Sequence, residues 1–155
     1  MERTVAHSTF VIERVFDATP AQVFGAFADP AVKRRWFSGP EEWEQGPLEL
    51  DFRVGGRERT SGGPDDGPRH LYEATYLDIV ASQRIVYSYV MHLDDRKISV
   101  SLSTVELLAA GAGTRMIYTE QDAFLDGFDH PAEREHGTRE LFDKMALVLR
   151  EHVRH

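Results

Sequence analysis

The sequence contains no cysteine. Disulfides, thiolate nucleophiles and zinc sites built on sulfur are therefore excluded. No apolar run approaches the roughly 18 residues that a membrane-spanning helix needs. Residues 1–7 also lack the basic and apolar regions of a secretory signal. These absences predict a cytoplasmic protein without a membrane span.

Basic residues are few relative to acidic ones. Lysine and arginine total 18 against 26 aspartates and glutamates, which leaves a formal net charge of -8. A charge of this sign repels a phosphate backbone, so nucleic acid is not an expected partner. The chain has 155 residues and is 41% apolar. Both values are typical of one globular domain, which we expect to span residues 1–155.

Established catalytic and cofactor motifs are also missing. The sequence has no Gly-x-Ser-x-Gly elbow, no phosphate-binding P-loop and no dinucleotide fingerprint. The seven histidines show no metal-ligand spacing apart from His152 and His155 at the C-terminus. We predict no metal and no cofactor.

The N-terminal part predicts a strand followed by two short helices. Apolar residues on both faces of Thr9 to Phe16 indicate a well-covered strand. Thr19-Pro20-Ala21-Gln22 has the cap, first-turn proline and glutamine of a helix start, and Asp29-Pro30 begins a second helix that runs through Trp36.

The remainder predicts an antiparallel meander and a long helix. Leu48 to Val54 alternates and meets Arg57 to Thr60 around Gly55-Gly56, which is typical of a hairpin. Four further strands are expected over 70–79, 84–91, 97–107 and 114–124, with a bulge near Ser103-Thr104 where the apolar face changes. Pro131 to Val153 has the three-and-four apolar spacing of one amphipathic helix. The predicted class is α+β in the order β-α-α-β6-α, a curved antiparallel sheet around the C-terminal helix.

The direction of Glu58 depends on the turn at Gly55-Gly56. A two-residue loop sends Arg57 and Arg59 to the face of Phe52, whereas a three-residue loop sends Glu58 and Thr60 there. A charge on that apolar face needs a partner or a ligand, since unpaired burial costs several kcal/mol. The alternative is that the hairpin projects beyond the helix and both of its faces are wet.

Several motifs, in order, resemble one known family. Asp51-Phe52-Arg53-Val54-Gly55-Gly56-Arg57 is similar to the D-x-R-x-G-G-R hairpin of proteins like the activator of the heat-shock chaperone ATPase. The helix pair ending in Trp36-Phe37, the hairpin Tyr72-Glu73 to Tyr89, and the pair Thr104-Val105-Glu106-Leu107 with Gly113-Thr114-Arg115-Met116 extend the resemblance from about Phe10 to Val153.

The resemblance implies the helix-grip fold of the SRPBCC superfamily, which includes START lipid-transfer domains and polyketide cyclases. Such folds hold lipids, sterols or polyketides between sheet and helix. The sequence departs from the family pattern at Phe128-Asp129-His130-Pro131, where a tryptophan is usual, and at Glu58 and Thr60, where apolar residues are usual. A chain of 155 residues leaves no space for the chaperone-binding domain of the eukaryotic co-chaperones, so direct ATPase activation is not expected.

We therefore expect a cavity that binds a hydrophobic or aromatic small molecule. The same residues could instead simply fill the core. The expected lining consists of aromatic, aliphatic and acidic residues: Trp36, Phe52, Glu58, Tyr72, Tyr76, Tyr87, Tyr89, Tyr118, Glu120, Leu141, Met145 and Leu149. Trp36 and Trp43 flank Ser38-Gly39-Pro40, a loop expected at the entrance.

Two alternatives remain open. The first is a polyketide-cyclase-like or hydrolytic enzyme, in which Glu58, Tyr118, Glu120 or His92 performs acid–base chemistry on the ligand. The second is a stress-linked protein that binds a partner or forms a homodimer through an exposed sheet edge or helix.

Overall fold

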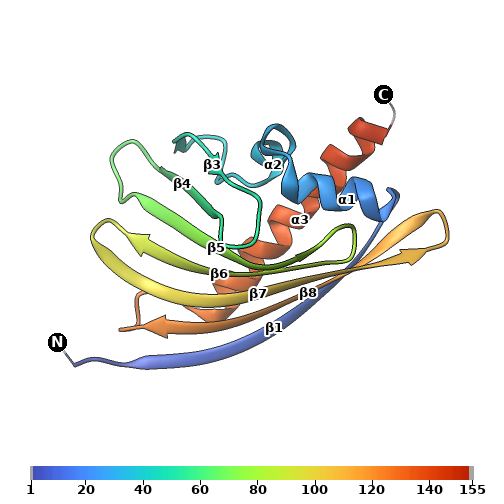
Figure 1. Cartoon of the computed structure of the whole chain (residues 1–155). Coiled ribbons are helices and arrows are strands. Elements are labelled where there is room, and N and C mark those ends of the chain that lie inside the picture. Colours follow the sequence, from blue (N-terminus) through green and yellow to red (C-terminus); the bar gives the residue numbers. More distant parts are fainter. Residues whose placement is uncertain (1, 154–155) are drawn as a thin grey trace.

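The computed structural model describes residues 2–153 and has the predicted α+β helix-grip architecture. In Figure 1 a strongly curved antiparallel sheet wraps around the long helix α3 (Pro131–Val153), which crosses its concave face. The sheet order is β1 (Val5–Phe16), β8 (Gly113–Leu125), β7 (Arg96–Ala110), β6 (Arg84–Leu93), β5 (His70–Val80), β4 (Arg57–Gly63) and β2 (Glu44–Gln45), and β3 (Glu49–Leu50) pairs with β4. The first and last long strands are therefore neighbours.

The N-terminal elements follow their sequence signals. β1 (Val5–Phe16) precedes α1 (Pro20–Ala28) and α2 (Pro30–Trp36). Thr19 and Gln22 form a capping box, and the Asp29 carboxylate accepts a hydrogen bond from the Ala31 N–H. Both short helices pack beside the C-terminal half of α3 (Figure 1).

Four long strands form the main body of the sheet. These are β5 (His70–Val80), β6 (Arg84–Leu93), β7 (Arg96–Ala110) and β8 (Gly113–Leu125). Each extends the predicted range by no more than a few residues at either end. All four pair antiparallel with their sequence neighbours.

The predicted strand from Leu48 to Val54 is wrong in its extent. Within that range only β3 (Glu49–Leu50) forms, and a further short strand, β2 (Glu44–Gln45), precedes it; both pair with β4 (Arg57–Gly63). Residues 51–56 form a loop, in which Gly55 and Gly56 exchange backbone hydrogen bonds with Tyr76. A Cβ on Gly56 would lie 2.0 Å from the Asp51 carbonyl oxygen, so the close approach requires glycine.

Neither short-turn register occurs at this hairpin. Glu58 pairs with Leu50 across a longer connection, because the chain turns through the whole 51–56 segment. The result for side chains is that Glu58 faces inward and is 1% exposed, while Arg57 and Arg59 are exposed. The hairpin is therefore not wet on both faces.

The predicted bulge near Ser103-Thr104 is also wrong. The pairing of β7 with β8 is continuous there, and the irregularity lies at Ile98, between the pairs Met91–Ser99 and His92–Lys97. In consequence Val100 and Leu102 lie exposed on the outer face, while Ser99, Ser101 and Ser103 face the concave side and are buried. Val100 and Leu102, whose apolar character predicts an inward orientation, therefore face outward.

Candidate functional site

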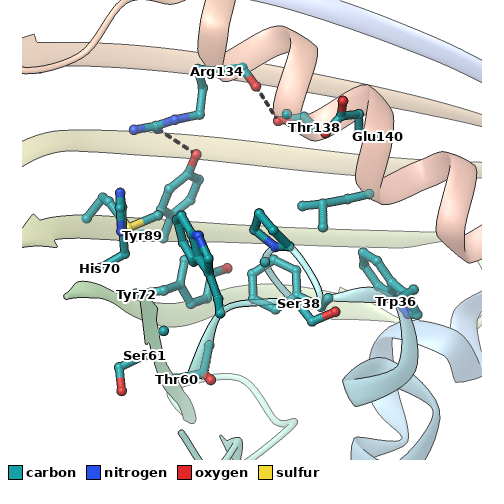
Figure 2. A pocket seen from close by; sticks show the side chains of 18 of the residues that line it. Trp36, Ser38, Thr60, Ser61, His70, Tyr72, Tyr89, Arg134, Thr138 and Glu140 are labelled. Carbon is teal, nitrogen blue, oxygen red and sulfur yellow. Dashed lines mark hydrogen bonds between the residues drawn. The ribbon is translucent and has the colours of Figure 1, made fainter. Parts of the chain in front are cut away.

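A cavity of about 700 Å³ lies between the concave face of the sheet and the N-terminal half of α3. Its walls come from β4 to β8, from loop 37–43 and from the segment that leads into α3. Figure 2 shows Tyr72, Tyr89 and His70 on the sheet side and Arg134, Thr138 and Glu140 on the helix side. The volume lies within the range of small-molecule pockets.

Aromatic side chains form a large part of the wall. Tyr72, Tyr87, Tyr89 and Tyr118 sit at alternate, inward-facing positions of β5, β6 and β8, so the two-residue period of the strands collects them on one face. Phe37 meets Tyr72 edge-on at 4.8 Å between ring centroids. Burial raises the pKa of Tyr72, Tyr89 and Tyr118 well above the ordinary value, so these hydroxyls stay protonated.

The residues expected to line the cavity divide into two groups. The wall contains Trp36, Tyr72, Tyr87, Tyr89, Tyr118, Glu120 and Leu141. The packed core beside it contains Phe52, Glu58, Tyr76, Met145 and Leu149. Met145 and Leu149 lie in the C-terminal half of α3, which packs directly against the core. Phe52 contacts the Tyr76 ring, and Glu58 is bonded to Lys33 and Tyr76.

Glu120 is a buried acidic side chain of the cavity wall. It accepts hydrogen bonds from the hydroxyls of Tyr118 at 2.5 Å and Tyr89 at 3.0 Å, and it is 1% exposed. Burial, followed by the neighbouring Asp122 carboxylate, raises the pKa of Glu120 to about 8. The group therefore changes its charge close to neutral pH.

Arg134 lies on α3 and faces Tyr89 and Glu120 from the helix side of the cavity. It donates to the Tyr89 hydroxyl at 2.8 Å (Figure 2). It also donates to Ser99 Oγ at 2.9 Å and to the Asp129 carboxylate at 2.6 Å. Glu120 and Asp122 lie 3.9 Å from its guanidinium. Burial alone lowers the pKa of Arg134, but Tyr89, Asp129 and Glu120 together hold it above the ordinary value, so the cation persists.

Sequence reasoning missed Arg134, Asp122 and the serines of β7. Ser101 Oγ donates to Asp122 at 2.5 Å, and Ser103 Oγ lies 2.9 Å from the Tyr118 hydroxyl. A signal existed, since serines at every second position in register with Glu120 and Asp122 indicate a polar interior stripe. The apolar residues Val100 and Leu102, which lie between these serines, favour the opposite orientation of the strand.

A second buried polar group joins the cavity to the core. Lys33 Nζ lies 2.5 Å from Glu58 Oε1, which also accepts a 2.5 Å hydrogen bond from the Tyr76 hydroxyl. Lys33 lines the cavity and lies 4.7 Å from the centroid of the Phe37 ring. The charge of Glu58 is thus paired with that of Lys33, whose burial no pattern in the sequence predicts.

Loop 37–43 covers one side of the cavity and is attached to α3. Lys144 Nζ donates to the Ser38 carbonyl at 2.9 Å and to the Gly39 carbonyl at 3.3 Å. Trp43 stacks on His70 with ring centroids 4.8 Å apart. The loop therefore forms part of the cavity wall; its position at the entrance stays a prediction.

Gly137 leaves part of the cavity open that a larger side chain at this position would fill. It lies in the middle of α3 and lines the cavity, and a Cβ built there meets no atom within 4 Å. Glycine inside a helix costs roughly 0.5–1 kcal/mol relative to alanine. Packing does not require the glycine, but an open cavity benefits from it.

Other predicted features lie away from the cavity. His92 is half-buried outside the cavity wall, with Nδ1 3.9 Å from Glu73, so it is not beside a ligand space. Over residues 2–153, no group of three or more potential ligands gathers as a metal site. His155 lies outside the described residues. Within the described part of the chain, no helix is long and apolar enough to cross a membrane.

Comparison with solved structures finds close relatives of this fold. A protein from Rhizobium leguminosarum is 43% identical, with 97% of this chain and 99% of that chain covered and a TM-score of 0.92. The Mll3558 protein from Rhizobium loti is 46% identical over 94% of this chain and 99% of its own, with a TM-score of 0.87. An AHSA1-like protein from Aeromonas hydrophila shares the fold at 21% identity, with 93% of each chain covered and a TM-score of 0.68.

The family comparison agrees with the structural one. Among curated proteins no sequence matches this chain significantly. The model of the family described as Activator of Hsp90 ATPase homolog 1-like protein matches residues 17–153, nearly the whole chain. The motifs quoted above and the helix-grip fold lead to the same assignment. The chain belongs to the Activator of Hsp90 ATPase homolog 1-like family.

Proposed function

We propose that this protein binds a hydrophobic or aromatic small molecule in the cavity between the sheet and α3. The observation that carries the proposal is the aromatic-lined space of about 700 Å³. A drug-sized ligand fits such a volume, and a few polar groups at one end can fix its orientation. Gly137 supports the proposal, because a larger residue there would strengthen α3 and occupy the space.

The test fills the cavity from α3. Gly137→Leu places an apolar side chain in the open space, so it is expected to abolish binding while thermal stability is kept or raised. His136→Leu adds the same side chain at the neighbouring exposed position and serves as the matched control. Binding is measured by native mass spectrometry of the protein from its source and by thermal shift with lipids, sterols and polyphenols. Equal binding by both variants, or no ligand and no shift for the native chain, contradicts the proposal.

A second candidate is an acid–base enzyme acting on the bound molecule. The specific observation is that Glu120 lines the cavity beside two tyrosine hydroxyls and has a pKa of about 8. Once ionised, its carboxylate can take a proton from carbon next to a ketone, which leaves the enolate for cyclisation.

Exchange of that proton provides the experiment. The protein is incubated with β-tetralone in deuterated buffer, and uptake of deuterium at the carbon beside the carbonyl is followed by mass spectrometry. Glu120→Gln is expected to remove the acceleration, whereas Glu106→Gln on the exposed side of β7 is not. If deuterium exchange with the native protein is no faster than in buffer alone, Glu120 does not have this role.

A further inference from the structure

We propose that the preferred ligand of this cavity is a cation, specifically an aromatic molecule that carries a protonated amine. The inference rests on the proposed binding function and names the ligand's chemical class. It follows from the excess of acidic groups around the cavity, from an unpaired buried carboxylate oxygen and from the aromatic faces beside them.

Acidic groups outnumber basic ones around the cavity. Among the described residues, the wall holds three basic side chains: Lys33, Arg134 and Lys144. Five acidic side chains share it: Glu41, Glu120, Asp129, Glu133 and Glu140. Two more carboxylates, Glu58 and Asp122, stand directly behind it. The potential inside favours a positive ligand, even with Glu120 protonated.

Each basic group of the wall is already neutralised or engaged. Glu58 pairs with Lys33 at 2.5 Å, and Lys144 donates to two backbone carbonyls of loop 37–43. Arg134 has Asp129 at 2.6 Å and two further carboxylates at 3.9 Å. An anionic ligand would therefore meet a guanidinium whose charge is offset by Asp129 and Asp122, and also by Glu120 once that group is ionised.

Two buried carboxylate oxygens lack a donor among the described residues: Glu58 Oε2 in the core and Asp122 Oδ2 directly behind the cavity wall. Asp122 is 4% exposed, and its Oδ1 accepts from Ser101, but its Oδ2 has no hydrogen-bond partner among the described residues. Asp122 adjoins Glu120 on the inward face of β8. A buried carboxylate oxygen without a donor is costly, so a ligand ammonium near Glu120 and Asp122 would relieve that cost.

Aromatic faces complete the preference. Tyr89 and Phe37 already pack against cations of the protein, with the Arg134 guanidinium 5.6 Å from the Tyr89 centroid and Lys33 Nζ 4.7 Å from the Phe37 centroid. Tyr72 and the stacked Trp43 offer further rings to a ligand. Aromatic faces attract ammonium groups and also accept flat apolar bodies.

The experiment compares three probes of nearly equal shape and different charge: naphthylmethylamine, naphthalenemethanol and naphthoate. Their affinities are measured by calorimetry at neutral pH. The amine is expected to bind about tenfold or more tightly than the alcohol, since charge-assisted hydrogen bonds are stronger than neutral ones. The acid is expected to bind more weakly than the alcohol.

Matched variants locate the effect. Asp122→Asn keeps the side-chain shape and is expected to reduce the amine's advantage severalfold at neutral pH without weakening the alcohol. Glu120→Gln is expected to do the same where Glu120 is ionised, above about pH 8. Asp17→Asn removes an exposed charge outside the cavity wall and serves as the control. Retained alcohol binding shows that each variant is folded.

The outcomes separate the two proposals. If none of the probes binds and none shifts the melting temperature, the proposed binding function fails. If the alcohol or the acid binds as tightly as the amine, the cation preference is overturned while binding stands. An amine advantage that survives both cavity variants unchanged also overturns the inference, because the carboxylates would not be its source.

Discussion

At the scale of single residues, two carboxylates behave differently because their neighbours differ. Glu58 faces a lysine at 2.5 Å, so its charge has a partner. Glu120 has tyrosine hydroxyls as its hydrogen-bond partners and a carboxylate neighbour, and its pKa rises to about 8. One carboxylate therefore anchors the core, whereas the other can respond to pH.

Glu120 makes stability depend on pH. Between its ordinary pKa of 4.5 and about 8, the folded chain keeps the proton that the unfolded chain has lost. The folded state then binds more protons, so the free energy of unfolding falls as pH rises through this window, by up to roughly 1.4 kcal/mol per pH unit. Above about pH 8 this contribution stops changing.

Glu120→Gln removes the contribution. The stability of the variant relative to the native chain is expected to increase from about pH 5 to about pH 8. Urea unfolding at a series of pH values measures the difference, with exposed Glu106→Gln as the control. Parallel curves for the native chain and Glu120→Gln would show that Glu120 titrates normally in the folded state.

The buried pair of Lys33 and Glu58 gives a second residue-scale prediction. Both side chains are nearly inaccessible, so Glu58→Gln leaves the lysine charge without its counter-ion and is expected to cost about 3 kcal/mol of unfolding free energy. The double variant Lys33→Met with Glu58→Leu removes both charges and is expected to recover most of that loss.

An exposed ion pair provides the control for this experiment. Asp78→Asn breaks the pair with Arg84 at the surface, where the expected loss is at most about 0.5–1 kcal/mol. Chemical denaturation measures the free energy of unfolding of Glu58→Gln, of the double variant and of Asp78→Asn. A double variant as unstable as Glu58→Gln would mean that packing, and not the unpaired charge, causes the loss.

At the scale of elements, sequence patterns succeeded where local chemistry decides. The capping box at Thr19 and the proline after Asp29 determine where α1 and α2 begin, and alternation identifies four long strands. The 51–56 loop escaped prediction because two glycines fit several turns. The choice among them depends on hydrogen bonds to Tyr76, which lies far along the chain.

The orientation of β7 shows a further reason for failure. Its serines face inward because Asp122, Tyr118 and Arg134 supply their partners from β8 and α3. Hydropathy alone assigns such a strand to the opposite face. The tyrosines and Glu120 of the cavity wall were identifiable from alternation, whereas Lys33 and Arg134 were not, since their burial depends on partners in other elements.

Loop 37–43 depends on α3 through one side chain. Lys144→Met keeps the length of the side chain but removes the donors to the Ser38 and Gly39 carbonyls. Loss of a hydrogen bond from a charged donor is expected to speed amide hydrogen exchange in this loop by about tenfold. Exchange elsewhere in the sheet should stay the same.

The control lies on the same helix. Arg150→Met removes an equal charge at an exposed position of α3. Hydrogen exchange followed by mass spectrometry compares the two variants with the native chain. Unchanged protection of the loop in Lys144→Met would mean that contacts such as the packing of Trp43 on Gly39 hold it without the lysine.

At the scale of the whole molecule, the curved sheet has two unlike faces. The concave face is aromatic and polar around the cavity, whereas the convex face exposes large apolar residues: Val11, Val15, Leu77, Val100, Leu102 and Leu108. Val90, Val100 and Ala123 are neighbours across three strands, so part of this apolar surface is continuous. Exposed continuous apolar surface is typical of a protein–protein contact.

This face carries the prediction of a homodimer. Light scattering is expected to give a mass twice that of the 17.6 kDa chain at high concentration. Leu102→Lys places a charge on the convex face and is expected to yield monomers, because burying an unpaired ammonium is costly.

Leu147→Lys makes the same change at the exposed side of α3 and distinguishes the helix from the sheet as the contact. Dimers lost only in Leu147→Lys would assign the interface to α3, and a monomeric native chain at every concentration would contradict dimerisation itself. Because Leu102 points away from the cavity, Leu102→Lys should bind the naphthyl probes as the native chain does, which separates assembly from ligand binding.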